Sequence, residues 1–493
     1  MINITFVYPD FESIGIEYLM ACCKKSGFEV SFVSYSGYDP YFYRKKINKK
    51  YDRIVKRISE TNPHVVAFSC VTGNFPIQLK CAESVKRAMP RVITVFGGVH
   101  PTLVPERVIR HEAVDCVFIG EAEDVLPYFL SQCSQTDNAL KLPNESIKGL
   151  VYKNNNNIIG AFESAENVII DNLPFPYKEP LIKFFPYMRS NYKIITSRGC
   201  PFFCSYCFNS TLHLKRNNTL RKRPVCDVIE ELKLAKSIYP LRYVHFLDDC
   251  FTESTRWLYE FSKKYREEIA LPFWCLSHPN FINYEVVSLL KEAGCISMVI
   301  GIQSLSKRIN KDILNRILDK KKIPKIIKNL KKRNIAVQVD HMLGIPEDSI
   351  KIEEKSILFY AKNKPDIISV FFLNYYPKTA IIDIAKEKGF LKNEDIEEIE
   401  NAKSITNGEL HSLYKETKEN KKYYAIAFFL NILPLLPSFL IRLLVKTKLY
   451  RIFQIKNYLL STVIPRLILC ILNTNDINGR WHLNRFFNRH LIK

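Results

Sequence analysis

The sequence predicts an α/β protein with two successive parallel-sheet domains and a helical C-terminal region. Strand-like apolar runs alternate with amphipathic helical segments twice along the 493 residues, and near residue 400 the alternation gives way to long apolar, basic segments. Such alternation indicates parallel strands joined by helices. A chain of this length can form several domains with their own cores. We expect domains or segments at 1–140, 141–188, 189–395 and 396–493.

The first 140 residues are expected to form a Rossmann-like sheet. Strands are expected at Ile2–Tyr8, Val30–Tyr35, Val65–Ser69, Val92–Phe96 and Cys116–Ile119, with helices between them near Ile14–Lys25, Lys49–Glu60, Phe75–Met89 and Leu103–Arg110. Ligands of such sheets bind outside the carboxyl ends of the strands. The candidate binding residues there are Ser69, Thr72, Gly97, Gly98, His100, Pro101, Gly120 and Glu121. Any one of these glycines, taken alone, is better explained by a tight turn, but four marked loops at the same sheet edge favour a ligand site.

A connector follows at 141–188. Its Asn-rich stretch, Asn154–Asn157, lies between two short apolar runs and predicts a small hairpin. The segment Leu173–Pro176 predicts an extended linker.

Three cysteines mark the start of the second domain. Cys200, Cys204 and Cys207 have the spacing Cys-x3-Cys-x2-Cys, with Tyr206 before the last of them. Cysteine thiolates hold iron–sulfur clusters, normally four to a cubane. Three ligands without an obvious fourth therefore indicate a 4Fe-4S cluster with one open iron, and an open position is typical of a reactive metal site. A structural zinc site and three buried thiols are the alternatives.

The cysteine motif resembles that of the radical S-adenosylmethionine (SAM) enzymes, and the resemblance extends over about residues 190–395. It implies a partial (β/α)6 barrel of TIM type, with cofactors at the strand ends. It also implies that the open iron binds the amino and carboxylate groups of SAM, and that an electron from the cluster releases a 5′-deoxyadenosyl radical. Strands are expected at Tyr192–Ser197, Tyr243–Leu247, Phe273–Ser277, Ser297–Ile302, Ala336–Leu343 and Ile367–Leu373.

The same resemblance implies SAM contacts residue by residue. Tyr206 would offer its backbone carbonyl to the adenine, and Asp248 or Asp249 would reach the methionyl amine or the substrate. Gln303 and Ser304 would contact the ribose and carboxylate, although Leu305 replaces the glycine that usually follows. The remaining SAM contacts, in the turn beside the adenine, are Gly344 and Pro346.

The N-terminal domain resembles the cobalamin-binding domain that precedes many radical SAM domains. The resemblance lies in Gly97–Thr102 and in Gly120–Glu123. Many such domains carry Asp-x-His-x-x-Gly, whose histidine ligates cobalt, and no stretch of this chain fits that pattern. Relatives without the motif hold cobalamin with no histidine ligand, and some keep the fold without the cofactor. His100 follows the Gly-Gly turn and is as well explained by packing on a helix start.

Together these resemblances imply a cobalamin-dependent radical SAM enzyme that methylates an unactivated carbon of a small-molecule or lipid substrate. The alternative enzyme has an empty cobalamin-like domain and catalyses cyclisation, rearrangement or tRNA modification. A basic membrane- or nucleic-acid-binding protein with a relic cluster is the non-enzymatic alternative. A reducing electron donor such as flavodoxin or ferredoxin is an expected partner, and nucleic acid is not.

Charge and cysteine usage bear on location. The fourteen cysteines are scattered, and such cysteines indicate a reducing cytoplasm. The formal net charge of +22 suits nucleic acid, an anionic membrane or solubility alone. The apolar runs Tyr423–Val445 and Tyr458–Leu472 are flanked by Lys and Arg and interrupted by proline. They predict either helices lying in a membrane surface or a helical cap on the barrel.

Overall fold

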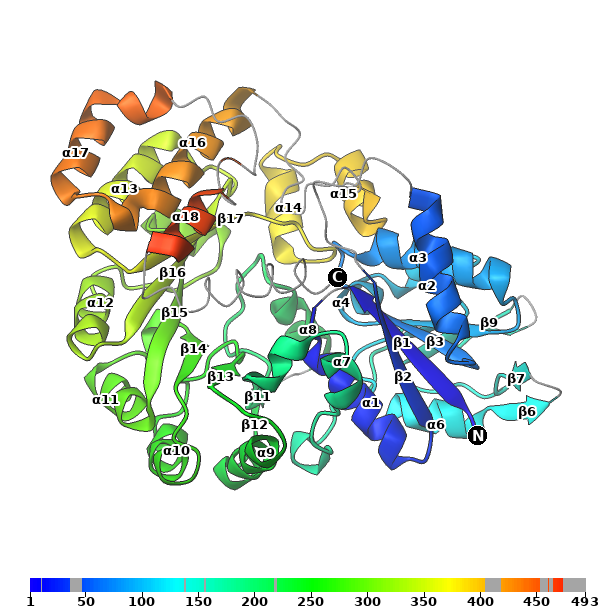
Figure 1. Cartoon of the computed structure of the whole chain (residues 1–493). Coiled ribbons are helices and arrows are strands. Elements are labelled where there is room, and N and C mark those ends of the chain that lie inside the picture. Colours follow the sequence, from blue (N-terminus) through cyan, green and yellow to red (C-terminus); the bar gives the residue numbers. More distant parts are fainter. Residues whose placement is uncertain are drawn as a thin grey trace. The chain divides into compact units, whose positions relative to one another are not determined.

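The computed structural model describes residues 1–9, 11–35, 47–136, 139–154, 157–216, 220–403, 418–452, 460 and 464–472. The chain folds as two compact units (Figure 1). The first comprises Met1–Pro186, Cys207–Thr219 and Tyr375–Leu410, and the second comprises Tyr187–Tyr206, Leu220–Asn374 and His411–Lys493. The α/β class expected from the sequence is confirmed in both.

The first unit is built on a seven-stranded sheet with the order β2-β1-β3-β4-β5-β8-β9. The strands are β1 (Asn3–Pro9), β2 (Glu29–Tyr35), β3 (Val65–Ser69), β4 (Ile93–Gly97), β5 (Cys116–Phe118), β8 (Leu150–Asn154) and β9 (Asn157–Ile159). The first five pair in parallel, whereas β8 pairs antiparallel with β5 and β9. The connector hairpin therefore extends the sheet. A separate hairpin joins β6 (Ser134–Thr136) and β7 (Ala139–Lys141).

Helices cover both faces of this sheet. They are α1 (Ile14–Lys25), α2 (Ile47–Ser59), α3 (Phe75–Ala88), α4 (Val99–Leu103), α5 (Pro105–Val108) and α6 (Val125–Gln132). The described residues of β1 are buried along its whole length, as expected for a central parallel strand. Helices α1 and α6 pack together, as do α2 and α3. The unit also contains α7 (Glu179–Ile182), α8 (Phe208–Arg216), α14 (Ala380–Glu387) and α15 (Asn393–Glu400).

The second unit contains a six-stranded, all-parallel sheet with the order β10-β13-β14-β15-β16-β17. Its strands are β10 (Asn191–Ile194), β13 (Tyr243–Phe246), β14 (Phe273–Ser277), β15 (Cys295–Gln303), β16 (Ala336–Leu343) and β17 (Ile367–Phe372). Between them run α9 (Val225–Ile238), α10 (Thr255–Glu268), α11 (Tyr284–Ala293), α12 (Ile323–Lys332) and α13 (Ile350–Asn363), on the outside of the curved sheet (Figure 1). This is the partial barrel that the sequence predicts.

Alternation along the strands divides side chains between the helix layer and the barrel interior. On β16, Val337 and Val339 belong to the core shared with the helices, so the alternate residues Gln338 and Asp340 face the other way. On β14, Phe273 and Cys275 likewise pack against helices, and Trp274 faces the interior. The barrel interior is therefore partly polar.

The C-terminal region packs on the barrel edge. Helix α16 (Lys418–Ile432) contacts β17 and α13, and α17 (Ser438–Thr447) contacts α13. Pro434 and Pro437 lie between these helices, and α18 (Ile464–Leu472) packs on α16. Among the residues described, no helix is long and apolar enough to cross a membrane.

Candidate functional site

Gly98 brings two strand-end loops of the first unit together. Its φ is 97°, and a Cβ built on it would lie 2.8 Å from the Cys70 carbonyl oxygen and 2.9 Å from the Cys70 nitrogen. This close approach allows Cys70 N–H to donate to Gly97 O (2.7 Å) and His100 N–H to donate to Cys70 O (3.0 Å). The loops after β3 and β4 therefore form one hydrogen-bonded edge, and only glycine fits at its centre.

His100 lies beneath this edge with its side chain fully buried. Its Nδ1 is 3.2 Å from Thr72 Oγ1, and its ring packs on Phe75 with centroids 4.6 Å apart. Among the described residues its Nε2 has no hydrogen-bond partner. Burial, aided by the nearby His111, lowers the pKa of His100 to about 3. The histidine is therefore neutral, and it fixes the two loops to α3.

The other predicted residues of this edge are also in place. Gly120, with φ of 101°, donates its N–H to Thr102 Oγ1 (3.0 Å), and Glu121 accepts from Val168 N–H (2.9 Å). Ser69 ends β3 and accepts at its carbonyl from Gln78, while Pro101 lies within α4. A Cβ added at Gly15 or Gly73 would meet no atom within 4 Å. Open space at Gly15, in the first turn of α1, and at Gly73, together with an unpartnered buried nitrogen, fits a large polar ligand at this edge.

The cysteine loop follows β10 and ends at Cys207, directly before α8. Cys204 is buried, and Cys200 and Cys207 are half-buried. Within the described ranges, no three His, Cys, Asp or Glu side chains already form a metal-binding group. The fit of a cluster is therefore judged from the chemistry around the individual thiols.

Arg316 supplies positive charge to this loop. Its guanidinium donates to Cys204 Sγ at 3.4 Å and to the carbonyl of Gly301. Burial acts to lower the pKa of Arg316, but the acidic groups of Tyr206 and Cys204 outweigh it and raise the pKa. A buried guanidinium beside a ligand sulfur suits an anionic iron–sulfur cluster.

The segment before Arg316 also holds the loop. Ser205 donates through its N–H to Leu314 O (3.0 Å) and through its hydroxyl to Ile313 O (2.5 Å). At the other end of the motif, Cys200 Sγ lies 3.9 Å from Cys250 Sγ. This contact lowers the pKa of Cys200 against the opposing effect of burial. The donor set therefore fits thiolate ligation.

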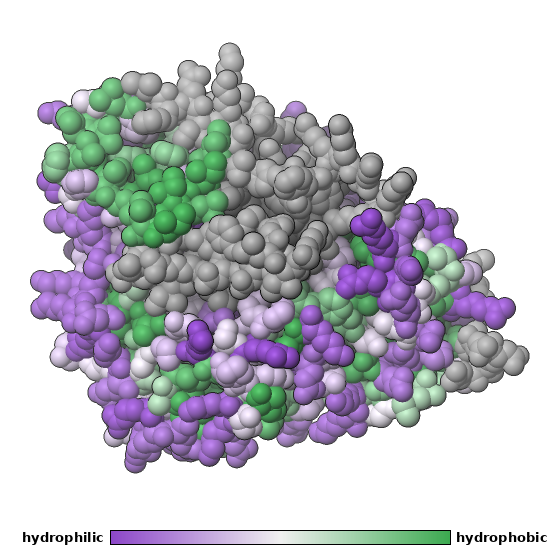
Figure 2. Space-filling model, viewed as in Figure 1, coloured by the Kyte–Doolittle hydropathy of each residue, from purple (hydrophilic) through white to green (hydrophobic). Residues whose placement is uncertain are grey.

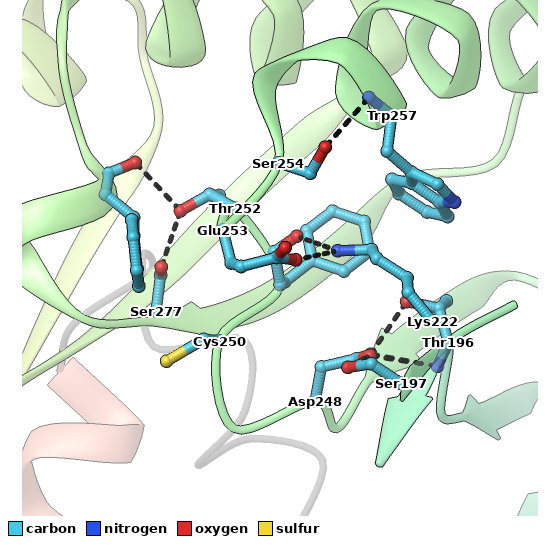
Figure 3. Close-up of polar contacts among 12 residues, drawn as sticks. Thr196, Ser197, Lys222, Asp248, Cys250, Thr252, Glu253, Ser254, Trp257 and Ser277 are labelled. Atoms are coloured by element: carbon cyan, nitrogen blue, oxygen red, sulfur yellow. Dashed lines mark hydrogen bonds and ion pairs between the residues drawn. The ribbon is translucent and has the colours of Figure 1, made fainter. Parts of the chain in front are cut away.

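Asp248, at the end of β13, anchors the chain that leads into the cysteines. Its carboxylate accepts from Thr196 N–H (3.0 Å), from the Thr196 hydroxyl (2.7 Å) and from the Ser197 hydroxyl (Figure 3). It is buried, whereas the neighbouring Asp249 is exposed. Of the two predicted carboxylates, Asp248 is therefore engaged with the loop, and Asp249 is solvent-exposed.

The remaining predicted SAM contacts lie at strand ends of the same unit. Gln303 ends β15 with φ of 63°, at an irregularity in the pairing with β16. Ser304 is buried, and its carbonyl accepts from Asn310 Nδ2 (2.7 Å). Gly344 and Pro346 lie in the buried turn after β16, and Tyr206 is half-buried. The binding roles of all these residues stay predictions.

A buried polar network that the sequence did not indicate supports this last turn. Asp348 accepts from Gly344 N–H (3.3 Å), and Glu353 contacts His341 Nε2 at 2.6 Å, while His341 Nδ1 lies 3.1 Å from Tyr360 OH. Burial raises the pKa of Glu353 to about 8 and lowers that of His341 to about 4. At neutral pH the shared proton therefore rests on the carboxyl group.

Arg316 and Asp340 are two further residues that the sequence reasoning missed. Burial raises the pKa of Asp340, on the inward face of β16, to about 6, and Gln338 donates to it at 3.3 Å. Arg316 follows a one-turn π-helix, Ile309–Ile313, in a segment with no repeating pattern. The one signal in the sequence was an acid, Asp340, within an otherwise largely apolar strand.

Comparison with known families agrees with both sites. Residues 2–130 match the B12 binding domain, and residues 194–357 match the radical SAM superfamily. The chain thus combines a domain that matches the B12-binding family with one that matches the radical SAM superfamily. Cys200, Cys204 and Cys207, the predicted cluster ligands, lie within the radical SAM match. The strand-end loops after β3, β4 and β5 lie within the B12-binding match.

Proteins similar to this chain include an uncharacterized methyltransferase, PH0819, of Pyrococcus horikoshii, 28% identical over 336 residues that cover 67% of this chain and 71% of the relative. An anaerobic magnesium-protoporphyrin IX monomethyl ester cyclase of Cereibacter sphaeroides is 19% identical over 442 residues, which cover 83% of this chain and 68% of the cyclase. The structure of the methyltransferase TsrM from Kitasatospora setae, with cobalamin and a 4Fe-4S cluster bound, matches with a TM-score of 0.61 at 15% identity, covering 78% of each chain. This last likeness concerns the fold.

Proposed function

We propose that this protein is a cobalamin-dependent radical SAM methyltransferase acting on an unactivated carbon. The observation that carries the proposal is the presence in one chain of a three-cysteine loop at the carboxyl end of a parallel barrel and a B12-binding domain. When bound, the cluster supplies the electron that cleaves SAM, and cobalamin supplies the methyl group. Methyltransferases among the relatives support this choice.

The residues of this chain divide the work of binding. Cys200, Cys204 and Cys207 would hold the cluster, with Arg316 balancing its negative charge. SAM would be bound by Tyr206, Asp248, Asp249, Gln303, Ser304, Gly344 and Pro346. Because the Asp248 carboxylate is engaged with Thr196 and Ser197, we assign the methionyl amine to Asp249 and the positioning of the loop to Asp248. Cobalamin would be bound at Ser69, Thr72, Gly97, Gly98, His100, Pro101, Gly120 and Glu121.

Partners follow from the chemistry. The substrate is a small molecule or lipid, and reductive cleavage of SAM needs an external electron donor of flavodoxin or ferredoxin type. We also propose contact between the C-terminal region and a membrane surface. We also propose that the domains of the chain end at residues 140, 188 and 395.

Anaerobic reconstitution with iron, sulfide and hydroxocobalamin tests the proposal. Iron, the cobalamin spectrum and the formation of 5′-deoxyadenosine are measured after desalting, with Cys204→Ala as the control that removes one ligand. About four irons per chain with bound cobalamin supports the two-cofactor enzyme. Iron and 5′-deoxyadenosine without cobalamin would contradict the methyl-transfer part and leave the radical part standing.

A second candidate is radical cyclisation or rearrangement on an empty B12-type domain. The observation that favours it is the cyclase relative, which aligns with more of this chain than PH0819 does. Product analysis separates the two: a gain in mass of one methylene in the product indicates methylation, and a loss of hydrogen without added carbon indicates cyclisation.

A further inference from the structure

Helices α17 and α18 present large apolar side chains to the outside of the second unit. We define the C-terminal apolar face as Phe439, Leu443, Leu467, Ile468, Ile471 and Leu472, which are 73%, 51%, 40%, 40%, 65% and 64% exposed. Figure 2 shows the corresponding hydrophobic area over the C-terminal helices. An apolar area of this extent on one side of a protein is typical of an interaction surface.

The exposed residues are distinct from those that attach the helices to the barrel. Ile441 and Val445 of α17 are buried four residues apart, and Leu469 of α18 is buried as well. On α18, Leu467, Ile468, Ile471 and Leu472 follow the spacing of a single helix face. Each helix therefore uses one side for the core of the unit and leaves a second apolar side uncovered.

The chain segment that carries this face is basic and lacks acidic side chains. No aspartate or glutamate occurs between Tyr423 and Asn475. On and just after α17, the exposed side chains Arg442, Lys446 and Lys448 accompany Phe439 and Leu443. Apolar residues flanked by Lys and Arg, on helices too short to span a bilayer, are typical of segments that lie in the membrane interface.

The charge also decides between a bilayer and a second copy of the chain. A symmetric contact through this face would place the basic residues of both copies against each other, and the chain carries a net charge of +22. An anionic bilayer supplies both the apolar layer and the opposite charge.

We propose that the C-terminal apolar face and the basic residues of α17 bind the surface of an anionic lipid bilayer, with both helices lying flat in the interface. The inference about the substrate rests on the proposed function: an enzyme held at this surface would take an amphiphilic substrate from the bilayer.

Cosedimentation of the full-length, anaerobically reconstituted protein tests the surface. The vesicles contain phosphatidylcholine alone or phosphatidylcholine mixed with phosphatidylglycerol. Leu467→Asp/Ile471→Asp removes the apolar face of α18, and Arg442→Glu/Lys446→Glu reverses the charge of α17. The matched controls are Leu234→Asp/Ile238→Asp on α9 and Lys328→Glu/Lys332→Glu on α12, which change equally exposed pairs four residues apart.

We expect the wild type to bind the mixed vesicles and to be released by salt. Each basic side chain near an anionic surface contributes about fivefold in affinity, so the charge variant should bind at least about tenfold more weakly. The α18 variant should lose binding, and both controls should keep it. No binding by the wild type, or unchanged binding by the α18 variant, overturns the surface. Self-association abolished by the α18 variant would assign the face to a second copy and likewise overturn it.

The cleavage of SAM in the same samples separates this inference from the proposed function. Variants that no longer bind vesicles but still form 5′-deoxyadenosine test the surface alone. Vesicle binding without 5′-deoxyadenosine from any sample would overturn the proposed function and leave the surface standing.

Discussion

Replacing Gly98 by alanine should open the strand-end edge of the B12-binding domain. Gly98 has φ of 97° and ψ of −166°, a conformation that is essentially restricted to glycine. The added Cβ would lie within 3.0 Å of two backbone atoms of Cys70. Backbone atoms inside a hydrogen-bonded loop cannot turn away as a flexible side chain can, so the two loops must separate.

The size of the effect follows from two contributions. A residue held in this backbone conformation costs about 1–3 kcal/mol. Separation of the loops also weakens the Cys70 N–H···Gly97 O and His100 N–H···Cys70 O bonds, each worth about 1 kcal/mol. We therefore expect Gly98→Ala to lower the local opening free energy by about 3–5 kcal/mol.

Hydrogen exchange measured by mass spectrometry over residues 65–103 is the suitable assay. The three tryptophans of the sequence, Trp257, Trp274 and Trp481, all lie outside residues 65–103, so tryptophan fluorescence does not report directly on this edge. A loss of about 3 kcal/mol corresponds to about 100-fold faster exchange of amides that open locally. Bound cobalamin after reconstitution provides a second readout.

Gly97→Ala is the control. Its backbone lies outside the positive-φ region, and its Cβ would meet only Phe118 Cβ at an ordinary 3.6 Å. We expect wild-type exchange for this variant. If Gly98→Ala exchanged as slowly as Gly97→Ala, the argument that only glycine fits the edge would be refuted.

Three further predictions follow. Lys178→Met removes the buried ammonium that pairs with Glu12 and Glu17 and should destabilise the first unit by about 3–5 kcal/mol in exchange measurements, whereas Lys148→Met, in an exposed pair, should cost less than about 1 kcal/mol. Because burial raises the pKa of Glu353 to about 8, its contribution to stability is full below the ordinary carboxyl pKa and is lost as pH rises through about 8. Glu353→Gln should reduce this decline in urea unfolding followed by tryptophan fluorescence, while the neighbouring Asp348, whose pKa burial also raises, keeps part of it; an unchanged pH profile would contradict the assignment. Arg316→Lys keeps the charge beside Cys204 but loses the two-pronged geometry, so less iron should remain after desalting, and unchanged iron content would count against its role.

Local sequence pattern was sufficient for the regular elements. The helix Ile14–Lys25 and the strands Val65–Ser69, Phe273–Ser277 and Ala336–Leu343 have the bounds that the sequence predicts. These segments carry their signal in consecutive residues, because a buried parallel strand is apolar along its length and an amphipathic helix repeats every 3.6 residues.

Contacts between segments that lie far apart in the sequence could not be predicted from local pattern. The predicted hairpin exists, but its pairing with β5, which makes it part of the first sheet, depends on a register between residues more than 30 apart. Arg316 reaches Cys204 across 112 residues, and no local pattern marks it. Likewise, the placement of α8 and of residues 375–410 with the first unit follows from packing that no stretch of sequence encodes alone.

The pair Asp248-Asp249 shows what the structure adds to a motif. In the sequence the two carboxylates are equivalent candidates for the methionyl amine. Both follow the end of β13, and they differ in burial, since Asp248 is buried and Asp249 is exposed to solvent. Asp248 accepts three kinds of hydrogen bond from Thr196 and Ser197, directly before the cysteine loop, and Asp249 is exposed. Positioning of the loop and recognition of a cation are therefore best divided between them, and a loss of Asp248 should disturb the cluster loop before it disturbs SAM binding.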